Sequence, residues 1–491
     1  MSALSIPKIH KGTLAAGLAS LIAYAIGNVY AISQDFWYLS LLPLGLGLVA
    51  FALLKPENFW LFMVFLTPFS LNVHIDFLQS SVSLPTEPFI AFFMLLLIFK
   101  FLLENKVDMD IVKHPITIII LLQLGWMFVS ACFSTLPLVS FKYLLARLWF
   151  VIVFYFFGVH IFKKIKRIDQ FNWCYLLSMG GAIVYTLFRH STEFFSHEYS
   201  YKAALPFFTD HNIYAVIVAF FVPTAIVYSL KSQTLKVSVF KTIVFYTLTF
   251  IYLVGVIASY TRAAWVSLGV AVAMYIALLL KLKLRHLLGA LFLVVGLIAF
   301  SWNDIMIYMS KNKVESDSDL DAHVQSIYNV TTDDSNTERL NRWTAALRMF
   351  EEKPVFGFGP NTYQFKYAPY QLSKTKTEIS TNLGDLGNAH SEFIGPLAEQ
   401  GIIGALLVVA LMLVAIHIGM QLFYQGKTER IKYLGLMVLL SFMTYYSHGL
   451  LNNYLDIDKA NVMFWGAMAI ITALSIHQKK LEVSSTSQNK Q

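Results

Sequence analysis

Two arginines and a histidine occur together in residues 336–404, and this combination suits transfer of a group from a phosphate leaving group. Arg339 and Arg342 come first, and His390 follows. A guanidinium group matches phosphate oxygens in bidentate geometry and keeps its charge. A histidine can take a proton from a hydroxyl near neutral pH. The stretch therefore contains groups able to hold a pyrophosphate and to activate a hydroxyl.

Two more arginines are predicted to lie on the same side of a membrane. Arg147 falls about one turn inside an apolar run, and Arg262 begins another. A charged side chain in hydrocarbon is costly, so its presence needs a reason. One interpretation is a cluster with Arg339 and Arg342 that binds an anion. The other is a set of separate ion pairs and snorkelling side chains, and residue type alone leaves both open.

Further polar residues are candidates for the lining of the same cavity: His211, Asn212, Tyr363 and Glu392. Either histidine can instead be a polar cap at a membrane interface. Glu392 and Glu399 follow His390 and can orient it or pair locally. The predicted outer loops contain no HExxH, cysteine-pair or Asp-x-Asp signature, so we expect no metal and no cofactor.

The elements that position these residues are predicted to be membrane-spanning helices. Of the 491 residues, 57% are hydrophobic and 13% charged, against about 25% charged in soluble domains. The mean hydropathy is +0.60. We expect an all-α bundle with about 12–14 spans, because apolar runs of helix length recur along the chain. The predicted spans are 12–31, 37–54, 57–73, 87–103, 115–133, 143–162, 172–188, 212–230, 240–258, 263–280, 285–301, 391–418, 432–450 and 460–476.

Lysine and arginine concentrate in alternate connections between these spans, for example in Lys163-Lys164-Ile165-Lys166-Arg167. The positive-inside rule then places both termini in the cytoplasm and residues 302–390 on the outer side. The net charge of +8 is explained as a topology signal, so no nucleic-acid partner is expected. Membrane lipids are the expected surroundings.

Four regions are predicted: an N-terminal bundle over 1–301, a large outer loop over 302–390, C-terminal spans over 391–478 and a polar tail over 479–491. Within the loop, Leu340, Trp343 and Leu347 recur at helical spacing, which predicts a helix from Thr337 to Glu352. Pro354 ends this helix. Gly357 and Gly359 then predict a sharp turn close to other backbone.

The order of these motifs resembles the O-antigen ligase and polymerase superfamily of bacterial inner-membrane glycan transferases. Five motifs carry the resemblance: Ser259-Tyr260-Thr261-Arg262, Arg339-x-x-x-Trp343, Pro354-Val355-Phe356-Gly357-Phe358-Gly359, Asn388-Ala389-His390 and Glu399-x-Gly401-Ile402-Ile403-Gly404.

The resemblance implies a metal-independent glycosyltransferase at the periplasmic face of the inner membrane. It would move a glycan from undecaprenyl pyrophosphate to an acceptor hydroxyl on lipid A core or a similar acceptor. Arg262 and Arg339 would hold the donor pyrophosphate, with Arg147 and Arg342 as further candidates, and His390 would be the base. The alternatives are a polysaccharide polymerase, a protein O-oligosaccharyltransferase and, outside enzymes, a transporter of a lipid-linked sugar.

Overall fold

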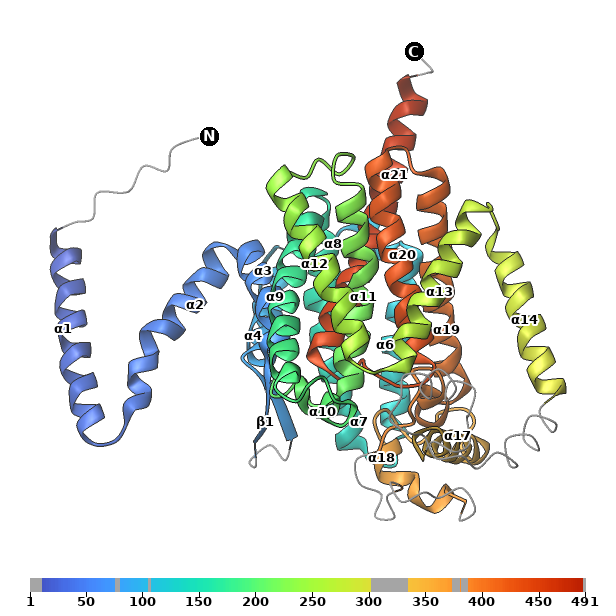
Figure 1. The fold of residues 1–491 in the computed structure, drawn as a ribbon. Coiled ribbons are helices and arrows are strands. Elements are labelled where there is room, and N and C mark those ends of the chain that lie inside the picture. The colour runs from blue at the N-terminus through green and yellow to red at the C-terminus, as the bar shows by residue number, and fades with distance from the viewer. Residues whose placement is uncertain are drawn as a thin grey trace. The chain divides into compact units, whose positions relative to one another are not determined.

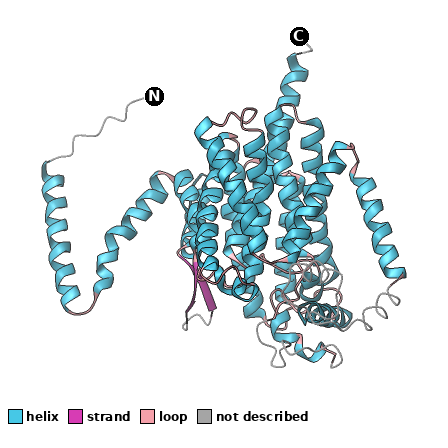
Figure 2. Ribbon diagram, viewed as in Figure 1, coloured by secondary structure: helices cyan, strands magenta, loops and turns pink. Residues whose placement is uncertain are grey.

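The computed structural model describes residues 11–75, 80–104, 107–301, 334–372, 380 and 387–488. Helices make up most of these residues (Figures 1 and 2), and the sheet they contain has two strands. The chain divides into two compact units, residues 1–62 and 63–491. All the candidate site residues belong to the second unit. The predicted outer loop contains an acidic run with Asp317, Asp319 and Asp321, and this run lies outside the described residues.

The predicted all-α, multi-span architecture is confirmed. Ten helices of the described part of the chain are long and apolar enough to cross a membrane. Many apolar side chains on them point outward, as expected for helices that face lipid. The ten are Trp37–Leu54 (η1 and α2), Thr86–Glu104 (α4), Pro115–Cys132 (α6), Pro137–Phe162 (α7, η4 and α8), Lys166–Ser191 (α9), His211–Leu230 (α11), Val239–Ala258 (α12), Arg262–Leu279 (α13), Ile394–Gln425 (α19) and Asp458–Ser484, which is most of α21 (Asp458–Gln488).

Three other predicted spans are helices that fall outside the ten: α1 (Lys11–Ser33), α14 (Leu284–Phe300) and α20 (Glu429–Gly449). The predicted span 57–73 is wrong in its second half. There α3 (Pro56–Leu66) ends early, because Pro68 follows and cannot supply a backbone N–H to continue the helix. Strands β1 (Leu71–Ile75) and β2 (Ser80–Leu84) form an antiparallel pair instead.

The core of the second unit is built around α11, α20 and α21. Helix α11 packs against α12 and α20, and α20 also packs against α13 and α19. Nearly every residue of the central part of α11 is buried, which matches its continuous apolar sequence. At one end of this bundle, α17 (Asp334–Glu352) packs across α19 (Figure 1). The predicted helix 337–352 is therefore confirmed.

Helix α19 is interrupted at Gly401, whose φ of 67° lies in the left-handed region. The kink leaves backbone groups without their usual helical partners. The loop after α17 supplies new ones through three backbone hydrogen bonds: Phe358 N–H to the Ala398 carbonyl (3.0 Å), Gly359 N–H to the Glu399 carbonyl (2.8 Å) and Ile402 N–H to the Pro354 carbonyl (2.9 Å).

The predicted tight turn at Gly357 and Gly359 is confirmed by this interlock. Both glycines have positive φ, 69° and 110°, and a Cβ on Gly357 would lie 2.3 Å from the Glu399 carbonyl carbon. Helix α6, which is distant in sequence, adds two side-chain hydrogen bonds to this interlock. Trp126 Nε1 donates to the Gln400 carbonyl at 2.8 Å, and the Ser130 hydroxyl donates to the Phe356 carbonyl at 2.8 Å.

The kink gives a stability prediction. Gly401→Ala would place a Cβ 2.0 Å from the Val355 carbonyl oxygen in a backbone conformation that side chains disfavour. We expect at least about 1–3 kcal/mol of destabilisation from the backbone alone, seen as a lower midpoint of thermal unfolding in detergent. The matched control is Gly269→Ala on α13, where the added methyl meets no atom within 4 Å. Equal midpoints for the two variants would contradict this account of the kink.

Candidate functional site

His390 lies in the short segment between the 354–372 loop and α19, in a conformation that its surroundings must hold. Its φ of 47° is left-handed, which is unusual for a residue with a side chain. The Trp343 indole N–H donates to the His390 carbonyl at 3.2 Å, and the His390 N–H donates to Asn388 Oδ1 at 3.1 Å. These bonds come from α17 and from the segment itself, so both elements hold the backbone of His390 in place.

The imidazole of His390 is held by an amide. Its Nδ1 lies 2.7 Å from Asn452 Oδ1, so Nδ1 carries the proton and donates it to that oxygen. Burial lowers the pKa of His390 to about 4, and the positive charges of Arg342 and Arg339 act in the same direction. The ring is therefore neutral at pH 7, with the lone pair of Nε2 available to accept a proton. This is the protonation state that a general base requires.

Arg339 contacts the turn of the chain that carries Asn452. Its Nε donates to the Leu451 carbonyl at 3.1 Å, one residue before the asparagine that holds His390. Burial lowers the pKa of Arg339 from its usual value, although a guanidinium remains charged at neutral pH. Arg262, at the start of α13, is near enough to Arg339 for their charges to repel. A bound anion would relieve that repulsion, and an anion site shared by these two arginines stays a prediction.

Glu392 fixes the turn 450–457 that joins these groups. One of its carboxylate oxygens accepts three hydrogen bonds, from the Tyr454 N–H (2.6 Å), the Leu455 N–H (3.0 Å) and the Tyr445 hydroxyl (2.7 Å). The Glu392 N–H also donates to the Gly449 carbonyl at 2.8 Å. Glu392 therefore acts on His390 through the backbone that carries Asn452.

His211 and Asn212 begin α11 on the same side of the bundle. The Asp210 side chain caps this helix, accepting from the Asn212 N–H at 2.8 Å, and it lies 3.1 Å from His211 Nδ1. Although burial raises the pKa of Asp210, the hydrogen bonds from His211 and Asn212 leave it below its usual value. The Asp210 charge acts on Arg339, so the start of α11 borders the arginine pair.

Arg342 and Tyr363 have structural partners. Arg342 Nε donates to Glu338 Oε1 at 2.6 Å inside a buried ion pair, and Nη1 donates to the Asn388 carbonyl at 3.0 Å. The Tyr363 hydroxyl donates to the Arg342 carbonyl at 2.8 Å. A guanidinium already engaged in this way anchors α17 to the segment that carries His390. Its contribution to the site is then the positive charge that lowers the pKa of His390.

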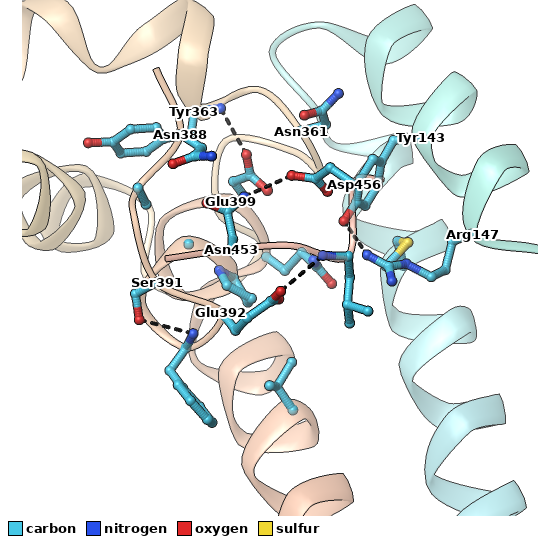
Figure 3. A pocket seen from close by; sticks show the side chains of 18 of the residues that line it. Tyr143, Arg147, Asn361, Tyr363, Asn388, Ser391, Glu392, Glu399, Asn453 and Asp456 are labelled. Atoms are coloured by element: carbon cyan, nitrogen blue, oxygen red, sulfur yellow. Dashed lines mark hydrogen bonds between the residues drawn. The ribbon is translucent and has the colours of Figure 1, made fainter. Parts of the chain in front are cut away.

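Arg147 lies in separate surroundings, in a polar cavity of about 310 Å³ (Figure 3). It donates to the Tyr143 hydroxyl and, at 3.4 Å, to Asn461 Oδ1. Glu392, Glu399 and Asp456 also line the cavity. Figure 3 shows Arg147 and Tyr143 on one side and the three carboxylates gathered opposite. The structure thus brings together Arg262, Arg339 and His390, and it places Arg147 with a group of acids.

Comparison with known proteins identifies a family that resembles part of the chain. A model of the family described as O-antigen ligase matches residues 247–409. This match supports a place for the chain in the O-antigen ligase superfamily. No curated protein matches the chain.

The matched O-antigen ligase region begins within α12 and ends within α19, so it contains Arg262, Arg339 and His390. It also contains the loop and the kink that interlock through Gly357, Gly359 and Gly401. The family is one of glycosyltransferase-like enzymes, and the match supports an activity of the O-antigen ligase or polymerase type for this protein with its many apolar helices.

Several residues around the O-antigen ligase region were missed by sequence reasoning. Asn452 and Leu451 hold His390 and Arg339, yet both lie beyond residue 409 in a short turn between α20 and α21. Asp456 lines the polar cavity from the same turn. A signal was present, because the run from Asn452 to Lys459 places five polar or charged side chains between two apolar helices. Among the described residues, no group of three His, Cys, Asp or Glu is arranged to hold a metal ion.

The contact with Asn452 predicts a change in the pH dependence of transfer. Asn452→Asp would place a carboxylate beside Nδ1 of His390 and favour the protonated ring, which raises its pKa from about 4. A base works only when unprotonated, so kcat/KM falls as the pH drops through this pKa. We therefore expect the acid limb of the kcat/KM profile to move to higher pH in the variant. An acid limb that stays in place would show that Asn452 does not position the base.

Proposed function

We propose that this protein is a metal-independent glycosyltransferase that moves a glycan from undecaprenyl pyrophosphate to an acceptor hydroxyl, on lipid A core or a similar glycan. The observation that carries the proposal is the turn at Leu451 and Asn452. Adjacent residues of this turn bind a guanidinium for the leaving group and a neutral histidine for the nucleophile. The family match supports the same class of reaction.

In the proposed reaction the acceptor oxygen attacks the anomeric carbon of the glycan, and its proton passes to Nε2 of His390. The bond between that carbon and the pyrophosphate oxygen breaks, and undecaprenyl pyrophosphate leaves. Arg262 and Arg339 stabilise the negative charge that develops on the leaving group, since fixed cations act most strongly where charge appears in the transition state. Arg342 and the turn 450–457 position the base.

Binding of the donor also prepares the base. Two of the charges that lower the pKa of His390 belong to Arg342 and Arg339. A pyrophosphate beside Arg339 opposes that positive field, so the pKa of His390 rises when the donor is bound. The base becomes stronger only once a leaving group is in place, which limits proton transfer in the empty site.

The distribution of lysine and arginine supports a location in the bacterial inner membrane, with both termini in the cytoplasm. The same distribution puts Arg262, Arg339 and His390 at the periplasmic face, where lipid-linked glycans and outer acceptors meet. This placement favours an enzyme over a transporter of lipid-linked sugars, whose polar residues would gather near the middle of the bilayer.

The test is reconstitution of the full chain in liposomes with an undecaprenyl-pyrophosphate glycan and three acceptors in separate arms. The acceptors are lipid A core, a second lipid-linked repeat unit and an acceptor protein. Transfer to lipid A core is the expected result. Transfer only to the lipid-linked unit would identify a polymerase, and transfer only to protein would identify a protein O-oligosaccharyltransferase. Absence of product in all three arms would overturn the transferase proposal.

A further inference from the structure

The polar cavity around Arg147 has no role in the reaction described above. It lies between α6, α7, α19 and the turn 450–457, and its volume of about 310 Å³ is at the lower end for small-molecule sites, which span roughly 300–1,000 Å³. We propose that it holds one uncharged sugar residue of a glycan substrate. The inference rests on the proposed function, because it names a subsite for a substrate of that reaction.

Buried polar atoms in the cavity wall lack partners. The Tyr446 side chain is only 7% exposed, and its hydroxyl has no hydrogen-bond partner in the described part of the chain. The same holds for Oδ1 of Asn453, and both residues line the cavity. A buried polar atom without a partner costs free energy that a bound hydroxyl would recover. The residues of the wall thus include one hydroxyl and one amide oxygen whose hydrogen-bonding capacity is unused.

The remaining lining has the chemistry of a carbohydrate site. Amide side chains of Gln123, Asn361, Gln364 and Asn388 offer both donors and acceptors. Phe464 and Trp465 supply flat apolar surface for the carbon face of a sugar ring. This mixture of amides and aromatics suits a compact molecule with many hydroxyls.

The charges of the cavity select against acidic sugars. Arg147 is the single cation among the lining residues, and three carboxylates line the cavity with it: Glu392, Glu399 and Asp456. The Arg147 guanidinium is already engaged by Tyr143 and Asn461. A carboxylate or phosphate on the ligand would lie beside these acidic side chains, and like charges brought together at low dielectric repel strongly. An uncharged sugar meets no such penalty.

The cavity is also joined to the reacting groups. Asn388, Ala389, Ser391 and Glu392 line it, and His390 belongs to the same five-residue segment. On the neighbouring turn, Asn453 lines the cavity while Asn452 holds the His390 imidazole. A sugar bound here therefore rests against the backbone that positions the base, one unit away from the reacting centre.

The first test measures binding of single sugars to the purified full chain by saturation-transfer difference NMR. The probes are galactose, N-acetylglucosamine and galacturonic acid. We expect the two neutral sugars to bind and galacturonic acid not to bind. Tyr446→Phe removes only the unpartnered hydroxyl and should weaken binding roughly threefold to tenfold. Tyr246→Phe, on an exposed part of α12, is the matched control and should bind like the parent.

A gain of binding tests the charge argument. Asp456→Asn keeps a hydrogen-bond acceptor and removes a carboxylate from the cavity wall, so galacturonic acid should then bind. Equal binding of acidic and neutral sugars to the parent chain, or unchanged binding in Tyr446→Phe, would overturn the proposal. His390→Ala should keep sugar binding even when transfer is lost, which separates failure of this inference from failure of the proposed reaction.

Kinetics then assign the sugar to one substrate. If the cavity holds a sugar residue of the acceptor, Tyr446→Phe raises the KM of the acceptor and leaves the KM of the donor unchanged. If it holds a residue of the donor glycan, the reverse change is expected. A KM that moves for neither substrate would show that the cavity takes no part in glycan binding.

Discussion

Replacing His390 by alanine is expected to lower kcat for glycan transfer by about 10²- to 10⁴-fold, the usual contribution of a positioned general base. The reason is that the imidazole is neutral at pH 7, with its pKa lowered to about 4, and is fixed through Nδ1 by Asn452. Donor binding should change little, because the arginines that hold the pyrophosphate are untouched. The measurement is kcat from steady-state transfer at saturating donor and acceptor.

The control for this variant is His286→Ala, since His286 is an exposed histidine near the start of α14 and away from the site. It should transfer at the parent rate. A His390→Ala protein with parent kcat would sink the assignment of the base. Because the parent base is neutral above about pH 4, its kcat/KM should stay flat from neutral pH down to near that value and fall below it.

Replacing Arg339 by alanine is expected to lower kcat/KM by about 10²- to 10³-fold, as removal of one preorganised group facing developing charge does in other enzymes. Arg339→Lys separates charge from shape. Lysine keeps the charge but loses the planar fork and the Nε bond to the Leu451 carbonyl, so we expect it to recover only a small part of the loss. The measurement is kcat/KM for the donor at fixed ionic strength.

Arg348→Ala provides the matched control for Arg339, because Arg348 is an exposed arginine on the same helix that donates to the Tyr370 carbonyl. It should leave kcat/KM close to the parent value. If Arg339→Lys were as active as the parent, only the charge at this position would matter. If Arg339→Ala were also fully active, the leaving group would have to be stabilised elsewhere.

The sequence was sufficient to predict most of the spans and to select three candidate site residues. Helix periodicity placed α17, and residue chemistry with motif order selected Arg262, Arg339 and His390, which the structure brings to one side of the bundle. Gly357 and Gly359 were informative because a positive φ restricts residue choice so strongly. These features are local or belong to a continuous stretch, which is why a single sequence reveals them.

The surroundings of each arginine could not be predicted, because they depend on which helices meet. Arg339 and Arg342 are three residues apart, yet Arg342 is held by Glu338 while Arg339 reaches the turn 450–457. Arg147 meets carboxylates that come from α19 and from that same turn. The partner of His390 is 62 residues away in sequence. No periodicity connects residues at such separations.

Because of the interlock at Gly401, the segment from α17 to the glycine turn depends on other helices for its hydrogen bonds. Although it reads as a polar insert between apolar spans, its backbone hydrogen bonds end on α19, and Trp126 and Ser130 of α6 complete them. Consider a chimaera in which only this insert is replaced by the insert of a related protein. The new insert would then meet α6 and α19 of a different protein, and these are the spans that form its hydrogen bonds. The unit that evolution can exchange is therefore the insert together with α6, α19 and the turn 450–457.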